Sequence, residues 1–407
     1  MSARSVRNLL IIWFAWIFIL LGFQAWTVMR FQIRHPDYVL EWTPIDTATT
    51  YKLNKPYLNE PFMNQQVAFD SEYYLSIATV GYNDTKVTSG VINGQRIPLN
   101  YAFLPFYPYV MRAIGFPLKL LGLNPIATST LAGVIVSVVG TLVGMFALFD
   151  LARDELSEDG AWRAVVYLLI FPAGFFLAMV YTEGLFVGLA FGALALLKRK
   201  QWLWAALLAV AATLTRAVGV ALMIPLAIAY LRTRPWKEIR VKGQGLRHAG
   251  LALLILLPLL AYIVWRLSPL GRLFQLVDEE YFGRQFLDIG SSLSGWVGAV
   301  KSLFGRNPQT AAYYMVEIGA TLLSLVACAF SFKRYPEVTA FSLAVILISL
   351  TSGYPQGMHR YVMTAPVVFL FLSRLGKNPA FDRFWAILST LLMGGLALLF
   401  AADMWAG

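Results

Sequence analysis

The sequence predicts an all-α polytopic membrane protein with about eleven transmembrane helices, and three observations support that class. First, 58% of the 407 residues are hydrophobic and only 14% are charged, whereas soluble domains are nearer half apolar and a quarter charged. Second, the apolar residues form runs long enough to cross a hydrocarbon layer about 30 Å thick. Third, Lys and Arg lie mostly between those runs, as they do in oriented membrane proteins. We interpret residues 1–407 as one integral-membrane domain whose charge of +11 reflects topology and not nucleic-acid binding.

The first apolar run, residues 9–29, follows Arg4 and Arg7, which place the N-terminus in the cytoplasm. The run is longer than a signal-peptide core and lacks a small-residue cleavage site, so we expect a retained first span. Residues 30–125 then form a long first extracytoplasmic loop, in which several prolines break any long helix. Its last part, residues 109–123, is apolar but contains proline and basic residues. We expect it to lie in the outer interface as a helix and not to cross.

Charge placement then sets the direction of the later spans. If residues 109–123 do not cross, the second span (about 126–149) runs inward, and every later basic cluster falls inside. These clusters comprise Arg153 with Arg163, residues 198–200, the basic run within 232–247, Lys333 with Arg334, and Arg374, Lys377 and Arg383. The remaining outer segments are 178–182, 268–310 and 352–360, and the C-terminus lies outside. Of these, residues 268–310 form the second extracytoplasmic loop, whose acidic residues are most simply solvated. Those acids are Asp278, Glu279, Glu280 and Asp288.

Motifs that are missing narrow the function. The single cysteine, Cys328, lies in an apolar run, so an intramolecular disulfide and a cysteine metal cluster are both excluded. The sequence contains no Walker loop, no Gly-x-Ser-x-Gly and no His-Glu-x-x-His, which disfavours ATP-driven transport, serine hydrolysis and zinc proteolysis. Two possibilities remain: group transfer from a lipid phosphate to an alcohol, and transport of an anionic solute.

Four stretches bring acids and bases to the predicted outer face. They contribute Asp70 and Glu72 in the first loop, Tyr181 and Glu183 at the start of the fourth span, Arg216 between the fifth and sixth, and His359, Arg360 and Tyr361 before the tenth. Carboxylates at a membrane face are costly to keep, which makes them candidates for chemistry on a substrate delivered from the bilayer. A carboxylate there can take a proton from a hydroxyl nucleophile, and basic groups can hold a phosphate leaving group.

The motifs around these residues resemble, in family order, those of glycosylphosphatidylinositol mannosyltransferase II, which has bacterial relatives and belongs to the GT-C superfamily of membrane glycosyltransferases. The stretch Phe69-Asp70-Ser71-Glu72, continuing to Gly81-Tyr82, resembles the Trp-Asp-x-x-x-(aromatic/Leu)-x-Ile-Ala-x-x-Gly-Tyr signature, with Phe69 in place of the usual Trp. The other similar stretches are 102–108, 171–186, 215–219 and 360–366. Together they cover about residues 65–370.

The resemblance implies a GT-C fold and an inverting transferase that takes mannose from a polyprenyl-phosphate donor at the extracytoplasmic face. Asp70 would correspond to the catalytic acidic residue of the first loop and would act as general base on the acceptor hydroxyl. Glu72 completes an acid-x-acid pair that could hold a divalent cation or position the acceptor. Whether the protein requires a metal ion is left open, and no other cofactor is expected. The remaining roles are orientation of the acceptor by Glu183, binding of the lipid phosphate by Arg216, His359 and Arg360, and lining of the sugar site by Tyr181 and Tyr361.

Alternatives stay open at this point. The same fold could use another lipid-linked sugar, and the chain could be a non-catalytic subunit of a larger complex. A lipid-linked-sugar or solute transporter would show paired halves with interrupted helices, which this sequence lacks. The acceptor could be a glycolipid, a glycan or a protein side chain. Membrane lipid is expected as a further partner of the protein. Short inner loops favour the plasma membrane of a prokaryote over the endoplasmic reticulum.

Overall fold

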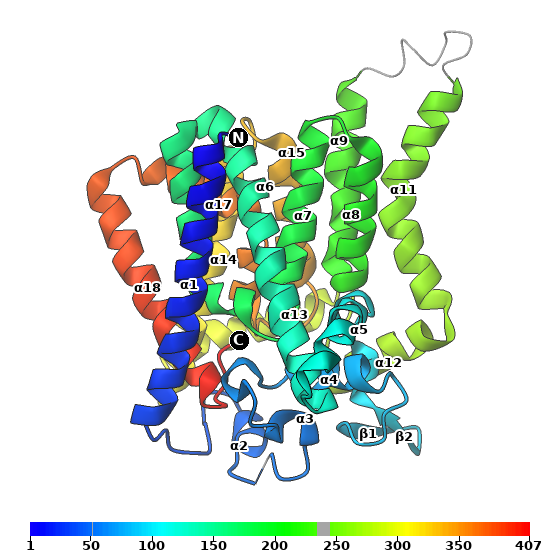
Figure 1. Cartoon of the computed structure of the whole chain (residues 1–407), viewed down its shortest axis with the longest axis vertical. Coiled ribbons are helices and arrows are strands. Elements are labelled where there is room, and N and C mark those ends of the chain that lie inside the picture. Colours follow the sequence, from blue (N-terminus) through cyan, green and yellow to red (C-terminus); the bar gives the residue numbers. More distant parts are fainter. Residues whose placement is uncertain (51, 234–244) are drawn as a thin grey trace.

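A computed structural model describes residues 1–50, 52–233 and 245–407, and most of these residues are helical. The helices that run along the long axis of the molecule (Figure 1) form a bundle. They are α1 (Ala3–Arg30), α6 (Pro125–Leu169), α7 (Glu183–Lys198), α8 (Trp202–Thr215), α9 (Met223–Arg232), α11 (Gly245–Leu267), α14 (Pro308–Ser331), α15 (Pro336–Leu350), α17 (Pro366–Leu375) and α18 (Pro379–Ala401). The basic run predicted within 232–247 falls largely outside the described residues.

Helix α6 is two antiparallel arms joined at Ser157, whose φ of 65° and ψ of 176° interrupt the helix. Trp13 and Trp16 of α1 lie against both arms. The Trp13 indole N–H donates to the carbonyl of Val138 at 2.8 Å, and that of Trp16 donates to the carbonyl of Leu169 at 3.0 Å. The two arms occupy the positions of the second and third predicted spans in the chain, and whether both cross stays a prediction.

Five helices within the described ranges are long and apolar enough to cross a membrane: α1, α6, α11, α14 and α18. Shorter apolar helices occupy Trp202–Thr215, Ala217–Arg232, Pro336–Leu350 and Pro366–Leu375. These helices confirm that the chain is an integral membrane protein, as the sequence predicts. A total of about eleven spans requires the shorter helices and both arms of α6 to cross, and it stays a prediction.

The segments that do not join the bundle gather at one end, opposite the N-terminus (Figure 1). They are α2 (Thr43–Asp46), α3 (Pro56–Asn59), α4 (Ser71–Thr79), β1 (Ser89–Ile92), β2 (Gln95–Pro98), α5 (Phe106–Leu118), α12 (Pro269–Phe282), α13 (Ile289–Ser302) and α16 (Met358–Met363), with short 3-10 turns such as Lys119–Leu121. Both predicted extracytoplasmic loops thus lie at the same end. Helix α5 corresponds to the expected interfacial helix, and Arg112 in it donates to the carbonyls of Ile77 and Ala78 at 2.7 and 2.9 Å, which ties α5 to the end of α4.

The antiparallel hairpin of β1 and β2 corrects the all-α expectation in one detail. Ser89 pairs with Pro98 and Ile92 with Gln95, so the turn consists of two residues. Those residues are Asn93 and Gly94, with φ of 50° and 77°. Two positive φ values are what a type I′ turn requires, and Asn-Gly is its preferred pair. The signal was therefore present in the sequence.

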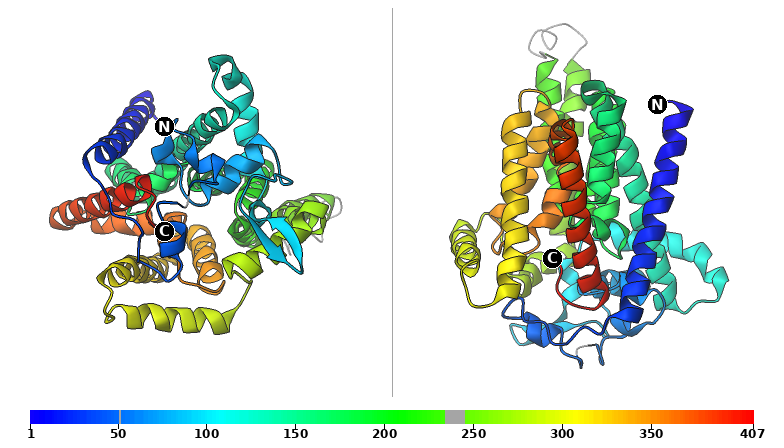
Figure 2. Two further views of the ribbon diagram at one scale, coloured as in Figure 1. Left: turned by 90° about the horizontal axis from the view of Figure 1, so that it is seen from below. Right: turned by 90° about the vertical axis from the view of Figure 1, so that its left-hand side faces the viewer.

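Close packing of α7 on α6 sets the position of the cluster described below. A Cβ added at Gly140 would lie 2.6 Å from the carbonyl oxygen of Gly184, and one added at Gly184 would lie 2.3 Å from that of Ser137. Only glycine at both positions lets the two backbones approach so closely, as small residues do between membrane helices. Seen from the loop end (Figure 2, left), the helices surround a centre in which the C-terminal residues lie.

Candidate functional site

A cavity of about 1480 Å³ lies between the first loop, helices α12 and α13, and the loop-side ends of α7, α8 and α16. Four of the predicted site residues line it: Asp70, Arg216, Arg360 and Tyr361. Aromatic rings make up much of the rest of its wall, including Trp42, Phe69, Tyr314, Tyr354 and Trp405. A concave site with many rings and a few converging charged groups is typical of a ligand pocket.

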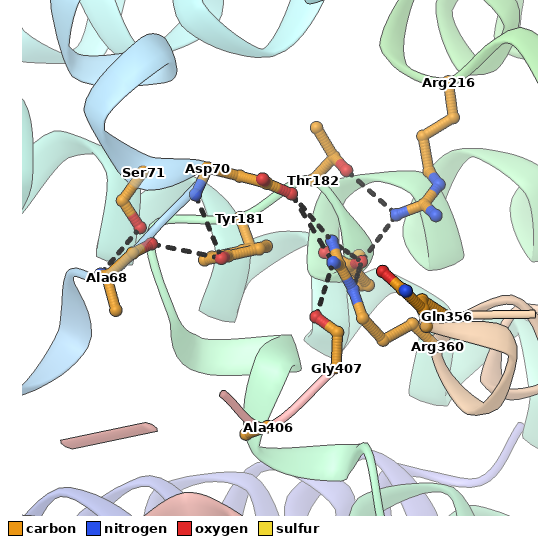
Figure 3. A network of polar contacts seen from close by, with 12 residues as sticks. Ala68, Asp70, Ser71, Tyr181, Thr182, Arg216, Gln356, Arg360, Ala406 and Gly407 are labelled. Carbon is orange, nitrogen blue, oxygen red and sulfur yellow. Dashed lines mark hydrogen bonds and ion pairs between the residues drawn. The ribbon is translucent and has the colours of Figure 1, made fainter. Parts of the chain in front are cut away.

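Asp70 precedes the first residue of α4, and Phe69 before it has a left-handed φ of 46°. Its side chain makes no capping bond to the helix, so the carboxylate extends toward the cavity. The side chain is 25% exposed, and Oδ2 lies 3.4 and 3.5 Å from Nη1 and Nη2 of Arg360. Figure 3 shows this contact. Asp70 thus remains accessible from the cavity while a cation holds its orientation.

Tyr181 supports the backbone on which Asp70 stands. Its hydroxyl accepts the backbone N–H of Asp70 at 3.2 Å and donates to the carbonyl of Ala68 at 3.1 Å (Figure 3). The ring also lies against a guanidinium group, because Cζ of Arg360 is 4.7 Å from its centroid. The tyrosine is buried, at 1% exposure, and so positions Asp70 and Arg360. Of the two tyrosines predicted to line the sugar site, Tyr361 is on the cavity wall and Tyr181 is not; the sugar contact itself stays a prediction.

Glu183 is the first residue of α7 and is fully buried. Its Oε1 accepts from Nη1 of Arg216 at 2.5 Å and from Nε of Arg360 at 2.8 Å, and it forms an ion pair with Nη2 of Arg360 at 2.7 Å. A buried carboxylate is tolerated when it is paired and hydrogen-bonded. Glu183 therefore holds the two arginines side by side, and the structure does not place it at the cavity where the predicted acceptor contact would occur.

Both ring nitrogens of His359 are already occupied by neighbouring groups. Nδ1 lies 3.0 Å from Oε2 of Glu317, and Nε2 lies 3.1 Å from the carbonyl oxygen of Ala406. The residue is 1% exposed and is not on the cavity wall, and its predicted contact with a lipid phosphate stays a prediction. Glu317 also accepts the backbone N–H groups of Gly357 and His359, which anchors the segment that carries Arg360.

Glu72 is likewise turned away from the cavity. Its Oε1 accepts from the backbone N–H and the hydroxyl of Thr88 at 2.9 and 2.7 Å, and its Oε2 lies 3.3 Å from Nζ of Lys55. These contacts fasten the chain leading into the hairpin onto α4. Within the described ranges, no group of three or more His, Cys, Asp or Glu residues is arranged to hold a metal ion. The divalent cation suggested for Asp70 and Glu72 stays an untested prediction, and the two carboxylates contact different partners.

Three features of the site were missed by sequence reasoning. Glu317 is an ionisable residue in an apolar run, and such residues are functional candidates by default. Arg284 lies in the second loop, which was interpreted as solvated. The residues after α18 form part of the cavity wall: Nη1 of Arg360 donates to the carbonyl of Gly407 at 3.1 Å (Figure 3), and Trp405 stacks edge-on to Trp42 with centroids 4.7 Å apart. No local sequence pattern indicates that contact.

The acidic residues of the second loop were expected to be solvated, but Asp278 of α12 is not. It lines the cavity, and burial raises the pKa of its carboxyl to about 7, although the nearby Arg284 guanidinium acts in the opposite direction. At neutral pH this carboxyl is therefore only partly ionised. It supplies much less than a full negative charge to that side of the cavity.

Three comparisons with known proteins were made. A family model described as mannosyltransferase (PIG-V) matches residues 10–233. A search of curated proteins found no significant match. Among solved structures, ArnT from Cupriavidus metallidurans bound to undecaprenyl phosphate is similar, with 15% identity and a TM-score of 0.49, over 80% of this chain and 59% of that one.

AglB, an oligosaccharyltransferase from Archaeoglobus fulgidus solved with an inhibitory peptide and a dolichol-phosphate, is another similar structure. It has 12% identity and a TM-score of 0.44, over 96% of this chain and 56% of its own. The chain thus spans less than two thirds of the length of either structure.

Proposed function

This chain belongs to the mannosyltransferase (PIG-V) family, and from that premise we propose that it is an inverting GT-C-type enzyme. It moves mannose from a polyprenyl-phosphate donor to an acceptor hydroxyl at the extracytoplasmic face of a prokaryotic plasma membrane. The observation that carries the proposal is the position of Asp70: its carboxylate is 25% exposed, lines the cavity and is oriented by Arg360.

The reaction follows from what such a carboxylate can do. Asp70 takes the proton of the acceptor hydroxyl as that oxygen bonds to the anomeric carbon of mannose. The bond from the anomeric carbon to the donor phosphate breaks on the opposite side, and its electron pair leaves with the polyprenyl phosphate. Attack opposite the leaving group converts a β-linked donor into an α-linked product. Cationic groups of the cavity wall compensate the charge that develops on the departing phosphate.

Two features support a face-located transfer over transport. The charged residues that line the cavity converge at one end of the bundle, and Asp70 has the exposure that a general base needs. A transporter would bring its polar groups to discontinuous helices near the bilayer midplane. Another lipid-linked sugar remains the alternative for the donor, because aromatic rings and carboxylates of this cavity would also contact other hexoses.

The donor can be tested with the purified protein. We expect one hexose to be added to a component of a membrane lipid extract when mannosyl-phosphoryl-polyprenol is supplied, as detected by mass spectrometry. Parallel reactions with lipid-linked glucose and arabinose, and with GDP-mannose, should give no product. Transfer from GDP-mannose would contradict the lipid-linked donor. Accumulation of solute in proteoliposomes without bond formation would favour the transporter.

The extracytoplasmic position predicts which residues a membrane-impermeant thiol reagent reaches. Cys328 is the single cysteine, so Cys328→Ser provides a background without thiols. In intact cells, we expect labelling after Val91→Cys, because Val91 is 69% exposed in the hairpin at the loop end. Lys377→Cys, exposed at the other end, should be labelled only after lysis. The reverse pattern would place the cavity in the cytoplasm and rule out the proposed face.

A further inference from the structure

Two guanidinium groups lie against Tyr361, and a third is bound to the same carboxylate as one of them. Cζ of Arg216 lies 4.6 Å from the centroid of its ring, and Cζ of Arg284 lies 5.5 Å from it. Arg284 also donates from Nη1 to the Tyr361 hydroxyl, and from Nη2 to the carbonyl of Gln356 at 3.4 Å. Arg360 is the third group, bound to the same Glu183 as Arg216. All three arginines line the cavity.

The three cations are not equally neutralised. Glu183 pairs with Arg216 and Arg360, and Asp70 pairs with Arg360. Among the residues that the structure describes, no carboxylate forms an ion pair with Arg284. Three guanidinium charges thus face two paired carboxylates, which leaves a surplus of one positive charge at Arg284. Asp278, whose carboxyl has a pKa of about 7, balances that surplus only in part at neutral pH.

The local backbone presents Arg284 to the cavity. Helix α12 ends at Gly283, whose φ is 59°, and the Arg284 N–H closes the helix by donating to the carbonyl of Asp278 at 3.2 Å. A Cβ at Gly283 would be strained at this positive φ and would lie 2.5 Å from the ring of Tyr354, which would have to move. Gln285 N–H then donates to the carbonyl of Ser352 at 3.1 Å, which joins this turn to the segment before α16. Such a glycine-closed helix end holds the residue that follows it in one place.

We propose that Arg284, with the Tyr361 hydroxyl and Arg216 beside it, forms the subsite that binds the phosphate of the lipid carrier. The proposal rests on the proposed function and assigns the phosphate to a residue from the second loop. A partly buried cation without a full counterion is costly, and an anionic ligand removes that cost. The planar fork of arginine matches two phosphate oxygens. Arg360, which the sequence analysis assigned to the phosphate, instead orients Asp70.

The test is binding of a long-chain polyprenyl monophosphate to the purified full chain in detergent, followed by intrinsic fluorescence, because Trp42 and Trp405 line the cavity. Arg284→Gln should weaken binding about 10- to 100-fold, the range for loss of a charge-assisted hydrogen bond. Arg284→Lys keeps the positive charge but loses the planar fork of donors. Its affinity should lie between those of the wild type and Arg284→Gln. The matched control is Arg272→Gln, which changes an exposed arginine of α12, the helix that precedes Arg284, and this arginine does not line the cavity. This variant should bind as the wild type does.

Three further ligands identify what the subsite recognises: the polyprenol without phosphate, phosphatidylglycerol and inorganic phosphate. Affinity for the polyprenol should not change in Arg284→Gln. Equal binding of polyprenyl phosphate by Arg284→Gln and the wild type would overturn the subsite. A loss confined to phosphatidylglycerol or inorganic phosphate would overturn its assignment to the carrier.

Binding of the unphosphorylated polyprenol separates lost phosphate recognition from lost folding, because a misfolded cavity would lose affinity for both ligands, whereas loss of the phosphate contact affects polyprenyl phosphate alone. A wild-type protein that binds no polyprenyl phosphate would instead contradict the proposed function. If the wild type binds and transfers while Arg284→Gln binds as tightly, only the subsite fails.

Discussion

Replacing Asp70 with Asn is expected to lower the rate of sugar transfer by about 10²- to 10⁴-fold, the usual contribution of a positioned general base. Asparagine has the same shape, and its carbonyl oxygen can still accept from Arg360, so the local structure should survive. What it loses is the ability to take the proton of the acceptor hydroxyl. The measurement is the transfer rate from mannosyl-phosphoryl-polyprenol, with thermal unfolding in detergent as the check on folding.

Glu72→Gln is the comparison that separates the two carboxylates of the motif. Glu72 is 1% exposed and bonded to Thr88, so its replacement weakens a buried hydrogen bond and should cost about 1–3 kcal/mol of stability. We expect the folded fraction of this variant to transfer sugar at a rate much closer to the wild type than Asp70→Asn does. An active Asp70→Asn would end the general-base assignment, and an inactive but stable Glu72→Gln would restore the idea of a functional pair.

Glu183→Gln is expected to destabilise the protein by about 3–5 kcal/mol and to abolish transfer. Glu183 is fully buried and holds Arg216 and Arg360, so its neutralisation leaves two guanidinium groups with too little negative charge near them. Breaking a buried pair by removing one partner has this cost because a buried charge is left uncompensated. Arg360 would also be released from the position in which it contacts Asp70. Thermal unfolding and the transfer assay report the two effects separately.

The double variant Glu183→Gln with Arg216→Gln tests the pairing itself. Removing both partners should cost less than the sum of the single changes, because the residues are in direct contact. The matched control is the ion pair of Glu337 with Arg232. Its nitrogen and oxygen atoms are 2.8 Å apart, but the arginine side chain is 60% exposed. Its disruption by Glu337→Gln should cost less than about 1 kcal/mol. Equal losses at the two pairs would show that burial does not set the strength of the Glu183 cluster.

Much of the site could be located from sequence motifs, but the direction of each side chain could not. Asp70 and Glu72 are two residues apart at the start of α4, and residues at that spacing lie on different sides of a helix. One carboxylate therefore reaches the cavity while the other bonds to Thr88. The neighbours His359 and Arg360 separate in the same way: His359 bonds to Glu317, and Arg360 reaches Asp70.

By itself, the sequence determined the membrane class, the polar loops and the acidic motif, because hydrophobic run length, charge and local motifs are properties of contiguous residues. Only the tertiary structure decided which charges pair. Glu183 meets Arg360 across 177 positions of the chain, and Arg360 meets the backbone of Gly407. Arg284 reaches Tyr361 from the turn after α12 and keeps a surplus positive charge. The physical reason is that a buried charge is stabilised by whichever opposite charge packing brings within a few ångströms, and packing joins segments whose local sequences carry no sign of one another.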